Sequence, residues 1–322
     1  MVCIGPYKLR NSVLLAPMAG ITDAPFRELA WRFGAGYVVS EMLASRGELW
    51  NTEKSRLRRV PVAGIEPRAV QIAGGDPQMV ADAARRHVDD GAQIVDINFG
   101  CPAKKVCRKA AGSQLLADPD LVVAIVRATV AAVPVPVTAK MRSGLSPDRR
   151  NGVEIAYRLQ EEGVAALAMH GRTRACGFAG EAEHDSVAAA KARLRIPVFA
   201  NGDIRTPAEA RALLERTGVD GVMVGRAALG APWLLGLMAD PARREPSLPE
   251  KWRVMAEHVA AMHEFYGPER GLKVARKHVQ WYLEALGFGA DAAVSPARSF
   301  TRLDDAGAQL EWLDAMGLEA AA

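Results

Sequence analysis

The chain has 322 residues, of which 49% are apolar and 24% are charged. This composition is typical of a globular protein and excludes a disordered or fibrous chain. The formal net charge of +4 permits a polyanionic partner but does not indicate one by itself.

Short apolar runs recur along the first two thirds of the chain and predict buried β-strands. Most of them are continuous rather than alternating, which is typical of parallel strands covered on both faces. The eight runs are Val13–Leu15, Tyr37–Ser40, Ala69–Ile72, Ile94–Asn98, Val137–Met141, Ala166–His170, Val198–Asn201 and Val222–Val224.

Amphipathic helices are predicted between these strands. Asp76 and Pro77 form a helix start, and Thr206 with Glu209 forms a capping box before a helix that Gly218 ends. Eight strand-then-helix units predict a (β/α)₈ TIM barrel. A doubly wound sheet is the alternative, but it predicts a G-x-G-x-x-G fingerprint after the first strand, where this chain has APMAG.

The pattern changes near residue 240. The stretch DPARREPSLPEKW is rich in proline and charge and reads as a linker. Beyond it, helices are predicted after a capping box of Ser247 and Glu250, then over Leu272–Leu286 and Ser295–Met316. We therefore expect a catalytic barrel over residues 1–240 and a small all-helical domain over residues 241–322.

Polar residues follow the predicted strands at their carboxyl ends, where barrels of this kind carry their chemistry. Taken singly, each has a structural explanation, such as a solvated lysine or a hydrogen-bonded histidine. Their recurrence on one rim favours a ligand site. The rim residues are Ala16–Gly20, Glu41, Met42, Gln71, Asn98, Cys101, Lys140, Arg142, His170, Arg172, Asn201–Asp203, Gly225 and Arg226.

The ligand chemistry follows from where these residues stand. Gly202, Gly225 and Arg226 follow the last two strands, which is the usual phosphate site of the fold. Gln71, Lys140 and His170 would ring the barrel mouth with donors suited to a flat heterocycle. Together they indicate flavin mononucleotide (FMN).

Cys101 lies between a glycine and a proline in DINFGCPAKKV. On its own it could be a packing residue, a metal ligand, a nucleophile or an acid. The other cysteines, Cys3, Cys107 and Cys176, share no C-x-x-C spacing with it or with each other, so a metal site is not indicated. We give Cys107 no role.

The N-terminus, MVCIGPYKLRNSVLLAPMAG, lacks the pattern of a signal peptide, and no apolar run approaches the about 20 residues that span a bilayer. A chain of this length has no need of disulfides. We expect a cytoplasmic protein with no membrane segment and no metal.

Several motifs occur in the order found in one family. They are LAPMAGITDAPFR, QIAGGDP, DINFGCPAKKV, GSQLL, TAKMRSG, HGRTR, ANGDI and VMVGRAALGAPW. With these motifs the chain resembles the tRNA-dihydrouridine synthases over nearly its whole length, and CPAKKVCRKAAGSQLL is most similar to their B-type bacterial branch.

The resemblance implies a barrel that holds FMN and a helical domain that binds tRNA. It assigns the coenzyme contacts to Pro17, Met18, Ala19, Gln71, Lys140, His170, Asn201, Asp203, Gly225 and Arg226. It makes Cys101 the catalytic acid and places Asn98 and Arg172 at the uracil pocket. It also implies NADPH, or NADH, as the reductant, for which we find no separate motif.

A thiol suits the acid role because its pKa of about 8.5 leaves it protonated at neutral pH. The reaction would add a hydride to C6 of uracil from the flavin and a proton to C5 from Cys101. We expect Cys101→Ala to keep the flavin and lose turnover.

Basic residues are expected to hold the RNA backbone. The candidates are Lys104, Lys105, Arg108, Lys109, Lys273, Arg276 and Lys277. Each could instead lie on a solvated helix face. From residue 241 onward ten Lys and Arg stand against twelve Asp and Glu, so RNA binding there must depend on a local patch.

Three other functions stay open at this point. A flavin dehydrogenase of a free pyrimidine, such as dihydroorotate, would share the barrel and flavin but has no need of the helical domain. An aldolase that forms a Schiff base on Lys140 would be colourless. A non-enzymatic RNA-binding protein would not need Cys101, Lys140 and His170 together.

Overall fold

The computed structural model describes residues 2–107, 111–288 and 296–319. Eight strands form one sheet, and two further strands form an N-terminal hairpin. In chain order the strands are β1 (Cys3–Ile4), β2 (Tyr7–Lys8), β3 (Val13–Leu15), β4 (Leu43–Ala44), β5 (Ala69–Ala73), β6 (Ile94–Phe99), β7 (Val137–Arg142), β8 (Ala166–His170), β9 (Val198–Asn201) and β10 (Gly221–Val224).

The strands of the large sheet are parallel, and the sheet closes on itself. Strands β4 to β10 pair in sequence order, and β10 pairs with β3. The gap between β3 and β5 is bridged by two isolated pairs, Leu14 with Tyr37 and Val39 with Ala69. The expected (β/α)₈ barrel is therefore confirmed.

The second predicted strand differs in detail. Residues 37–40 pair through these two bridges only, and the strand β4 lies three residues further on, at Leu43–Ala44. Tyr37 and Val39 are still buried inside the barrel, since the apolar pattern reports burial more directly than ladder pairing.

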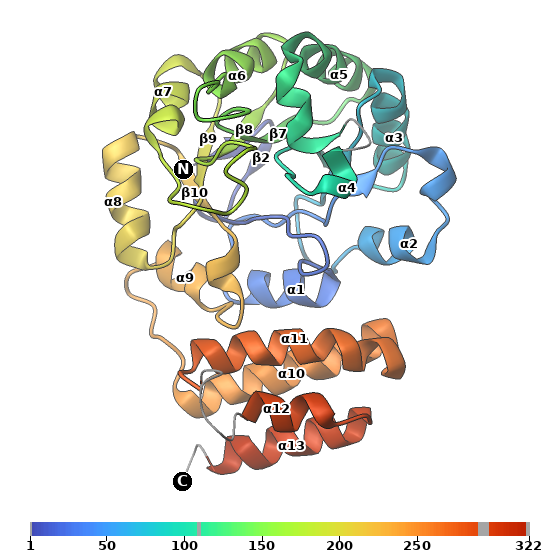
Figure 1. The fold of residues 1–322 in the computed structure, drawn as a ribbon, viewed down its shortest axis with the longest axis vertical. Coiled ribbons are helices and arrows are strands. Elements are labelled where there is room, and N and C mark those ends of the chain that lie inside the picture. The colour runs from blue at the N-terminus through green and yellow to red at the C-terminus, as the bar shows by residue number, and fades with distance from the viewer. Residues whose placement is uncertain (1, 108–110, 289–295, 320–322) are drawn as a thin grey trace.

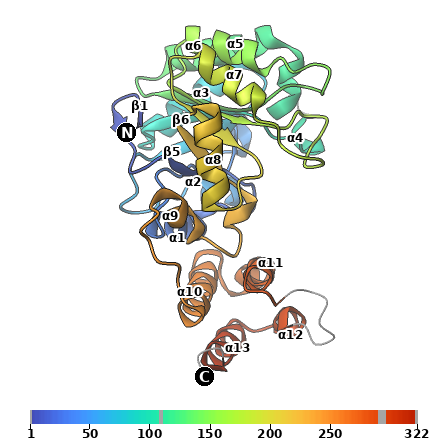
Figure 2. The same ribbon diagram turned by 90° about the vertical axis from the view of Figure 1, so that its left-hand side faces the viewer.

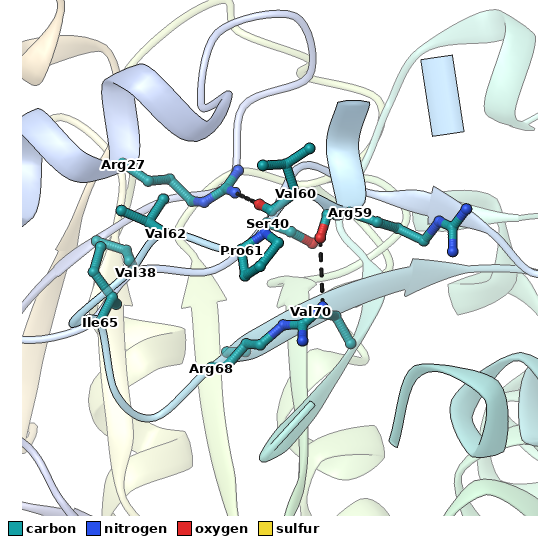
Figure 3. A pocket seen from close by; sticks show the side chains of 11 residues that line it. Arg27, Val38, Ser40, Arg59, Val60, Pro61, Val62, Ile65, Arg68 and Val70 are labelled. Atoms are coloured by element: carbon teal, nitrogen blue, oxygen red, sulfur yellow. Dashed lines mark hydrogen bonds between the residues drawn. The ribbon is translucent and has the colours of Figure 1, made fainter. Parts of the chain in front are cut away.

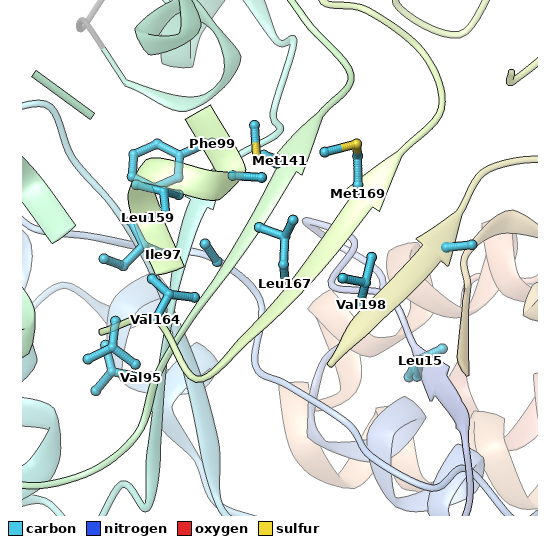
Figure 4. Packing of buried hydrophobic residues seen from close by; sticks show 14 of the residues in the cluster. Leu15, Val95, Ile97, Phe99, Met141, Leu159, Val164, Leu167, Met169 and Val198 are labelled. Atoms are coloured by element: carbon cyan, nitrogen blue, oxygen red, sulfur yellow. The ribbon is translucent and has the colours of Figure 1, made fainter. Parts of the chain in front are cut away.

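Side-chain alternation divides each strand between two environments. Val95, Ile97 and Phe99 of β6 point outward and pack with Leu167 and Met169 of β8 in the layer under the helices (Figure 4). The residues between them point into the barrel. This alternation turns the polar residues Asp96, Asn98, Lys140 and His170 toward the barrel axis.

The amino end of the barrel is closed by the hairpin β1–β2. Ile4 and Leu9 are buried in the interior cluster with Leu14, Phe199 and neighbouring side chains. A Cβ on Gly5 would lie 2.5 Å from Pro136, which immediately precedes β7. The hairpin thus plugs the end opposite the carboxyl termini of the strands.

Helices surround the barrel and begin as the sequence predicts. Asp76 caps α3, the capping box of Thr206 and Glu209 starts α8, and Gly218 ends α8 with a φ of 65°. The barrel helices are α1 (Ala24–Arg32), α2 (Glu53–Arg59), α3 (Pro77–Asp89), α4 (Lys104–Cys107), α5 (Pro119–Ala132), α6 (Gly152–Glu161), α7 (Asp185–Arg193), α8 (Pro207–Thr217) and α9 (Leu234–Ala239), with 3-10 turns at Gly47–Leu49, Gly112–Ala117 and Arg226–Ala228.

Four helices follow the barrel and lie beyond α1 and α9 at one side of the molecule (Figures 1 and 2). They are α10 (Leu248–Tyr266), α11 (Pro268–Ala285), α12 (Pro296–Arg302) and α13 (Ala306–Glu319). They share a core around Trp252, Met255, Val279 and Tyr282, to which Leu29 and Trp233 of the barrel contribute. The predicted helical segment is confirmed, and the boundary at residue 240 stays a prediction.

The single helix expected over Ser295–Met316 is wrong. Ser295 lies outside the described residues, and the remainder is split into α12 and α13. Asp305 explains the break, because its carboxylate accepts a hydrogen bond from the Ala308 amide at 2.9 Å and so caps α13 as a new helix. Within the described ranges, none of the helices is long and apolar enough to cross a bilayer.

The C-terminal helices also make polar contacts with the loop that follows β3. The Tyr266 hydroxyl donates to Asp23 at 2.7 Å, and the Lys277 ammonium donates to the Gly20 carbonyl. The Glu41 carboxylate accepts from the Gly20 amide. The loop is therefore held from both the barrel and the helical segment.

Candidate functional site

A cavity of about 1200 Å³ opens at the carboxyl ends of the barrel strands. Cys101, Asn98 and all the residues expected to contact the coenzyme line it. These are Pro17, Met18, Ala19, Gln71, Lys140, His170, Asn201, Gly202, Asp203, Gly225 and Arg226. The rim residues that the sequence singled out thus converge on one space.

The floor of the cavity carries a buried hydrogen-bond network. The Gln71 amide donates to Asp96 at 2.7 Å, and the Asn98 amide donates to the Gln71 oxygen at 2.8 Å. The Thr138 hydroxyl donates to the other Asp96 oxygen at 2.7 Å. Gln71 and Asn98 are consequently held in one orientation, with their partners on adjacent strands.

Asn98 fixes the loop that carries Cys101. Its side-chain oxygen accepts hydrogen bonds from the amides of Gly100 at 3.1 Å and Cys101 at 2.9 Å. The carbonyl of Cys101 accepts from both the amide and the hydroxyl of Ser113. A Cβ on Gly112, whose φ is +67°, would lie 2.7 Å from that carbonyl, so a glycine allows this close approach.

The Cys101 thiol is half-buried and free. Burial raises the pKa of Cys101 above its ordinary value, against smaller opposing effects that include the positive charges of Arg142 and Lys140. The group is therefore a protonated thiol at neutral pH, which is the state of an acid rather than of a nucleophile.

Lys140 is a buried ammonium at the centre of the site. It donates to the Asn201 oxygen at 2.9 Å, and none of the ion pairs of the described residues includes it. Burial and the charge of Arg142 lower the pKa of Lys140 to about 8. A buried cation with an amide as its hydrogen-bond partner fits an electron-rich ligand.

His170 stands beside this cation as a neutral imidazole. Burial, followed by the charges of Lys140, Arg142 and Arg172, lowers the pKa of His170 to about 2. A Cβ on Gly202 would lie 2.7 Å from the His170 ring, so the chain passes close to it only because residue 202 is a glycine.

Arg142 joins two loops of the cavity wall. Its Nε donates to the Gly100 carbonyl at 2.8 Å, and its Nη1 donates to the carbonyls of Thr173 at 2.9 Å and Gly177 at 2.8 Å. Burial lowers the pKa of Arg142 to about 10, which leaves the guanidinium charged at neutral pH. The Cys101 loop and the loop after β8 are thus tied to one side chain.

Arg172 lies behind the wall and not in it. Its guanidinium pairs with both oxygens of Asp203, at 3.0 and 2.7 Å, and also donates to the Ala179 and Gly180 carbonyls. It is not among the residues that line the cavity, and its place at the uracil pocket stays a prediction. Its observed contacts are those of a residue that orients Asp203.

The Asp203 carboxylate in turn lies within 4 Å of three arginines. Besides Arg172, it lies 3.8 Å from Arg205 and 3.6 Å from Arg226. Burial acts to raise the pKa of Asp203, but the hydrogen bonds and charge of Arg172 outweigh it, so the pKa is lowered. One carboxylate against three guanidiniums leaves an excess of positive charge beside Gly202 and Gly225, as an anion site requires.

The basic residues expected to hold RNA are spread over several places. Lys273 is exposed, whereas Arg276 donates to the Leu303 carbonyl at 2.9 Å and Lys277 to the Gly20 carbonyl. Arg108 and Lys109 lie outside the described residues, and α4 holds Lys104 and Lys105, whose side chains the structure does not describe.

Two aromatic residues of the lining, Phe178 and Trp281, were not predicted from the sequence. Phe178 lies in the irregular loop after β8. Trp281 lies on α11 and reaches the cavity only because the helical segment docks beside Gly230, where a Cβ would meet the Trp281 backbone at 2.1 Å.

A second, much smaller cavity lies beside β5. It has a volume of about 30 Å³ and is lined by Arg27, Ser40, Arg59, Arg68 and their neighbours (Figure 3). Arg27 closes it by donating to the Val60 carbonyl at 2.7 Å. The space suits one or two water molecules and no coenzyme.

Comparison with known proteins agrees with the geometry. The family model described as "Dihydrouridine synthase (Dus)" matches residues 14–315. A tRNA-dihydrouridine synthase B of Pseudomonas aeruginosa is 53% identical over 314 residues, which cover 96% of this chain and 93% of that protein. One from Escherichia coli K12 is 51% identical over 317 residues, which cover 97% and 98%.

Proposed function

The chain belongs to the dihydrouridine synthase family, and from this we propose that it reduces the C5=C6 bond of specific uridines in tRNA to 5,6-dihydrouridine. The observation that carries the proposal is that Cys101 lines the same cavity as Lys140, Gln71 and His170.

The residues present fit flavin mononucleotide as the coenzyme. The cavity of about 1200 Å³ is larger than most coenzyme sites need, and it leaves room for a second ring. The arginine-rich end at Gly202, Gly225 and Arg226 would hold the phosphate, while Lys140, Gln71 and Asn201 would hold the polar edge of the ring. When bound, this group would supply the hydride for C6 of the uracil.

Cys101 would supply the proton for C5. Its pKa is raised by burial, so the thiol carries that proton at neutral pH, and Asn98, Ser113 and Arg142 hold its loop in place. Asn98 acts here through the loop, because its oxygen already accepts two amide hydrogen bonds. Arg172 likewise acts through Asp203.

The RNA would be held by contacts of basic side chains with its phosphates. Lys104, Lys105, Arg108 and Lys273 are the candidates for phosphate contacts. Arg276 and Lys277 would serve this role only by leaving their present carbonyl partners. We propose NADPH, or NADH, as the reductant, and the cytoplasm as the compartment, in keeping with four free thiols.

The test uses the purified protein, reconstituted with flavin mononucleotide and supplied with NADPH. Unmodified tRNA is offered in one arm and dihydroorotate with an electron acceptor in the other. We expect dihydrouridine in the tRNA, detected by mass spectrometry of its nucleosides, and no turnover of the free pyrimidine. A colourless protein that cannot bind the flavin would refute the proposal.

A further inference from the structure

Phe178 lies in the wall of the main cavity and is largely exposed. The residue is 59% exposed, and it is the one aromatic residue among the exposed large apolar side chains of the described part of the chain. It lines the main cavity and, because of its exposure, stands at the opening. An apolar ring left in water at that place is available to a ligand.

Two positive charges flank this ring. The guanidinium carbon of Arg226 lies 5.0 Å from the ring centre, and that of Arg142 lies 5.6 Å from it. Both distances are within the range of cation–π attraction. The Phe178 ring therefore presents a flat apolar surface in a positive environment.

The position of the ring relative to Cys101 is fixed by Arg142. The same guanidinium that donates to the Gly100 carbonyl, next to Cys101, donates to the Gly177 carbonyl, next to Phe178. The turn that carries Phe178 is closed by the Ala179 amide, which donates to the Cys176 carbonyl at 2.8 Å. A ligand group on the ring is thus held at a set distance from the thiol.

On the basis of the proposed function, we propose that Phe178, whose loop Arg142 holds in place, forms a stacking platform for an RNA base next to the uridine that enters the cavity. A nucleotide combines a flat π-face with a phosphate charge, and the platform offers a complement to each. Exposed Arg205 can meet the phosphate of that nucleotide, because Arg226 is assigned to the phosphate of the coenzyme.

The exposure of the ring favours RNA over the dinucleotide reductant. A uridine turned into the cavity leaves its neighbours at the opening, where Phe178 stands. Exposed Arg205 adds charge on the same side, since it shares the Asp203 carboxylate with two other arginines. The reductant, in contrast, must reach the interior of the cavity and has no need of a ring at its edge.

The experiment separates the two half-reactions of the FMN-loaded protein. Reduced protein is mixed anaerobically with unmodified tRNA, and reoxidation at 450 nm is followed as tRNA concentration rises. Phe178→Ala should raise the tRNA concentration for half-maximal reoxidation by about 5- to 150-fold, the range for one lost base–aromatic stack. Flavin content and reduction by NADPH without RNA should stay within about twofold of wild type.

Matched variants distinguish an effect of ring stacking from an effect of side-chain volume. Phe178→Tyr keeps the π-face and should behave as wild type, whereas Phe178→Leu keeps apolar volume and should resemble Phe178→Ala. Met79→Ala removes an exposed apolar side chain from α3 and should change neither half-reaction.

Three results would overturn the proposal while leaving the proposed function intact. They are an unchanged tRNA dependence in Phe178→Ala, a defect confined to NADPH reduction or flavin retention, and wild-type behaviour of Phe178→Leu. If wild-type protein itself fails to reduce tRNA, the proposed function fails instead, and that outcome is read before any variant is compared.

Discussion

At the scale of single residues, burial outweighs charge in setting the state of Cys101. Arg142 and Lys140 both favour a thiolate, yet desolvation raises the pKa of the thiol overall. The same desolvation lowers the pKa of Lys140 to about 8. The site therefore holds a proton on sulfur and a positive charge on nitrogen at neutral pH, the combination that protonation of an electron-rich carbon needs.

Cys101→Ala should remove the proton donor and leave the coenzyme site intact. We expect flavin retention near that of wild type and a rate of tRNA reduction lowered by about 100-fold or more, as for loss of a general acid. Absorbance at 450 nm measures flavin retention, and the dihydrouridine content of the tRNA measures its reduction. Cys3→Ala, which removes an exposed thiol at the opposite end of the barrel, is the matched control. Undiminished reduction by Cys101→Ala would remove the acid assignment.

Lys140 should give the apoprotein a distinct dependence of stability on pH. The folded chain releases this proton near pH 8 and the unfolded chain near pH 10.5, so between these values the unfolded state binds more protons and the free energy of unfolding rises with pH. Relative to Lys140→Met, the free energy of unfolding of the wild type should rise by about 2 kcal/mol between about pH 8 and about pH 9.5. Urea denaturation at each pH measures this difference, and parallel curves would contradict the lowered pKa.

At the scale of elements, the loops are held by close backbone approaches. Gly112→Ala should displace the Cys101 loop, because the new Cβ would lie 2.7 Å from the Cys101 carbonyl. We expect flavin binding to persist and tRNA reduction to fall about tenfold or more, as reacting groups move out of line. Gly64→Ala is the control, since Gly64 has a similar positive φ of +73° with open space around it. Equal activity of the two variants would refute this account.

The contact between α10 and the loop after β3 should contribute to stability. Tyr266→Phe removes the hydroxyl that donates to buried Asp23 and leaves the ring in place. The free energy of unfolding should fall by about 1–2 kcal/mol, the cost of one such lost hydrogen bond. Urea denaturation checks this value, and an unchanged midpoint would show that Asp23 finds another partner.

Local signals in the sequence were sufficient for most elements and failed where pairing is decided in three dimensions. The caps at Asp76 and Thr206 and the buried strands follow from short patterns. Residues 37–40 are buried and mostly apolar, but their place between β3 and β5 leaves them two bridges instead of a ladder. The break before α13 depends on one aspartate, Asp305, within an otherwise helical pattern.

The residues of the site divide in the same way into those that could be predicted from the sequence and those that could not. Residues at strand ends were predictable, because the (β/α)₈ topology brings every strand end to one rim. Phe178 and Trp281 were not, since one depends on the course of an irregular loop and the other on how α11 docks. The pairing of Arg172 with Asp203 was equally hidden, because it depends on how the loops after β8 and β9 meet.

At the scale of the whole molecule, the net charge of +4 is too small to bind RNA without local concentration. Affinity for tRNA should therefore come from a few phosphate contacts and should fall at least about tenfold between about 50 and 200 mM salt. Lys273→Gln should reduce the slope of log affinity against log salt by about one. Lys8→Gln, on the hairpin at the opposite end, should leave it unchanged. Binding measured at several salt concentrations decides this, and a flat salt response would exclude the lysines.

Trp281 makes the C-terminal helices a part of the wall of the main cavity. An exchange of C-terminal segments between relatives would replace one wall of this cavity together with the Lys277 contact to Gly20. Such chimaeras should therefore lose catalytic activity as well as tRNA selectivity. We therefore expect substrate preference to depend on both segments together. Changing it by domain exchange would require that the barrel rim be replaced along with the C-terminal helices.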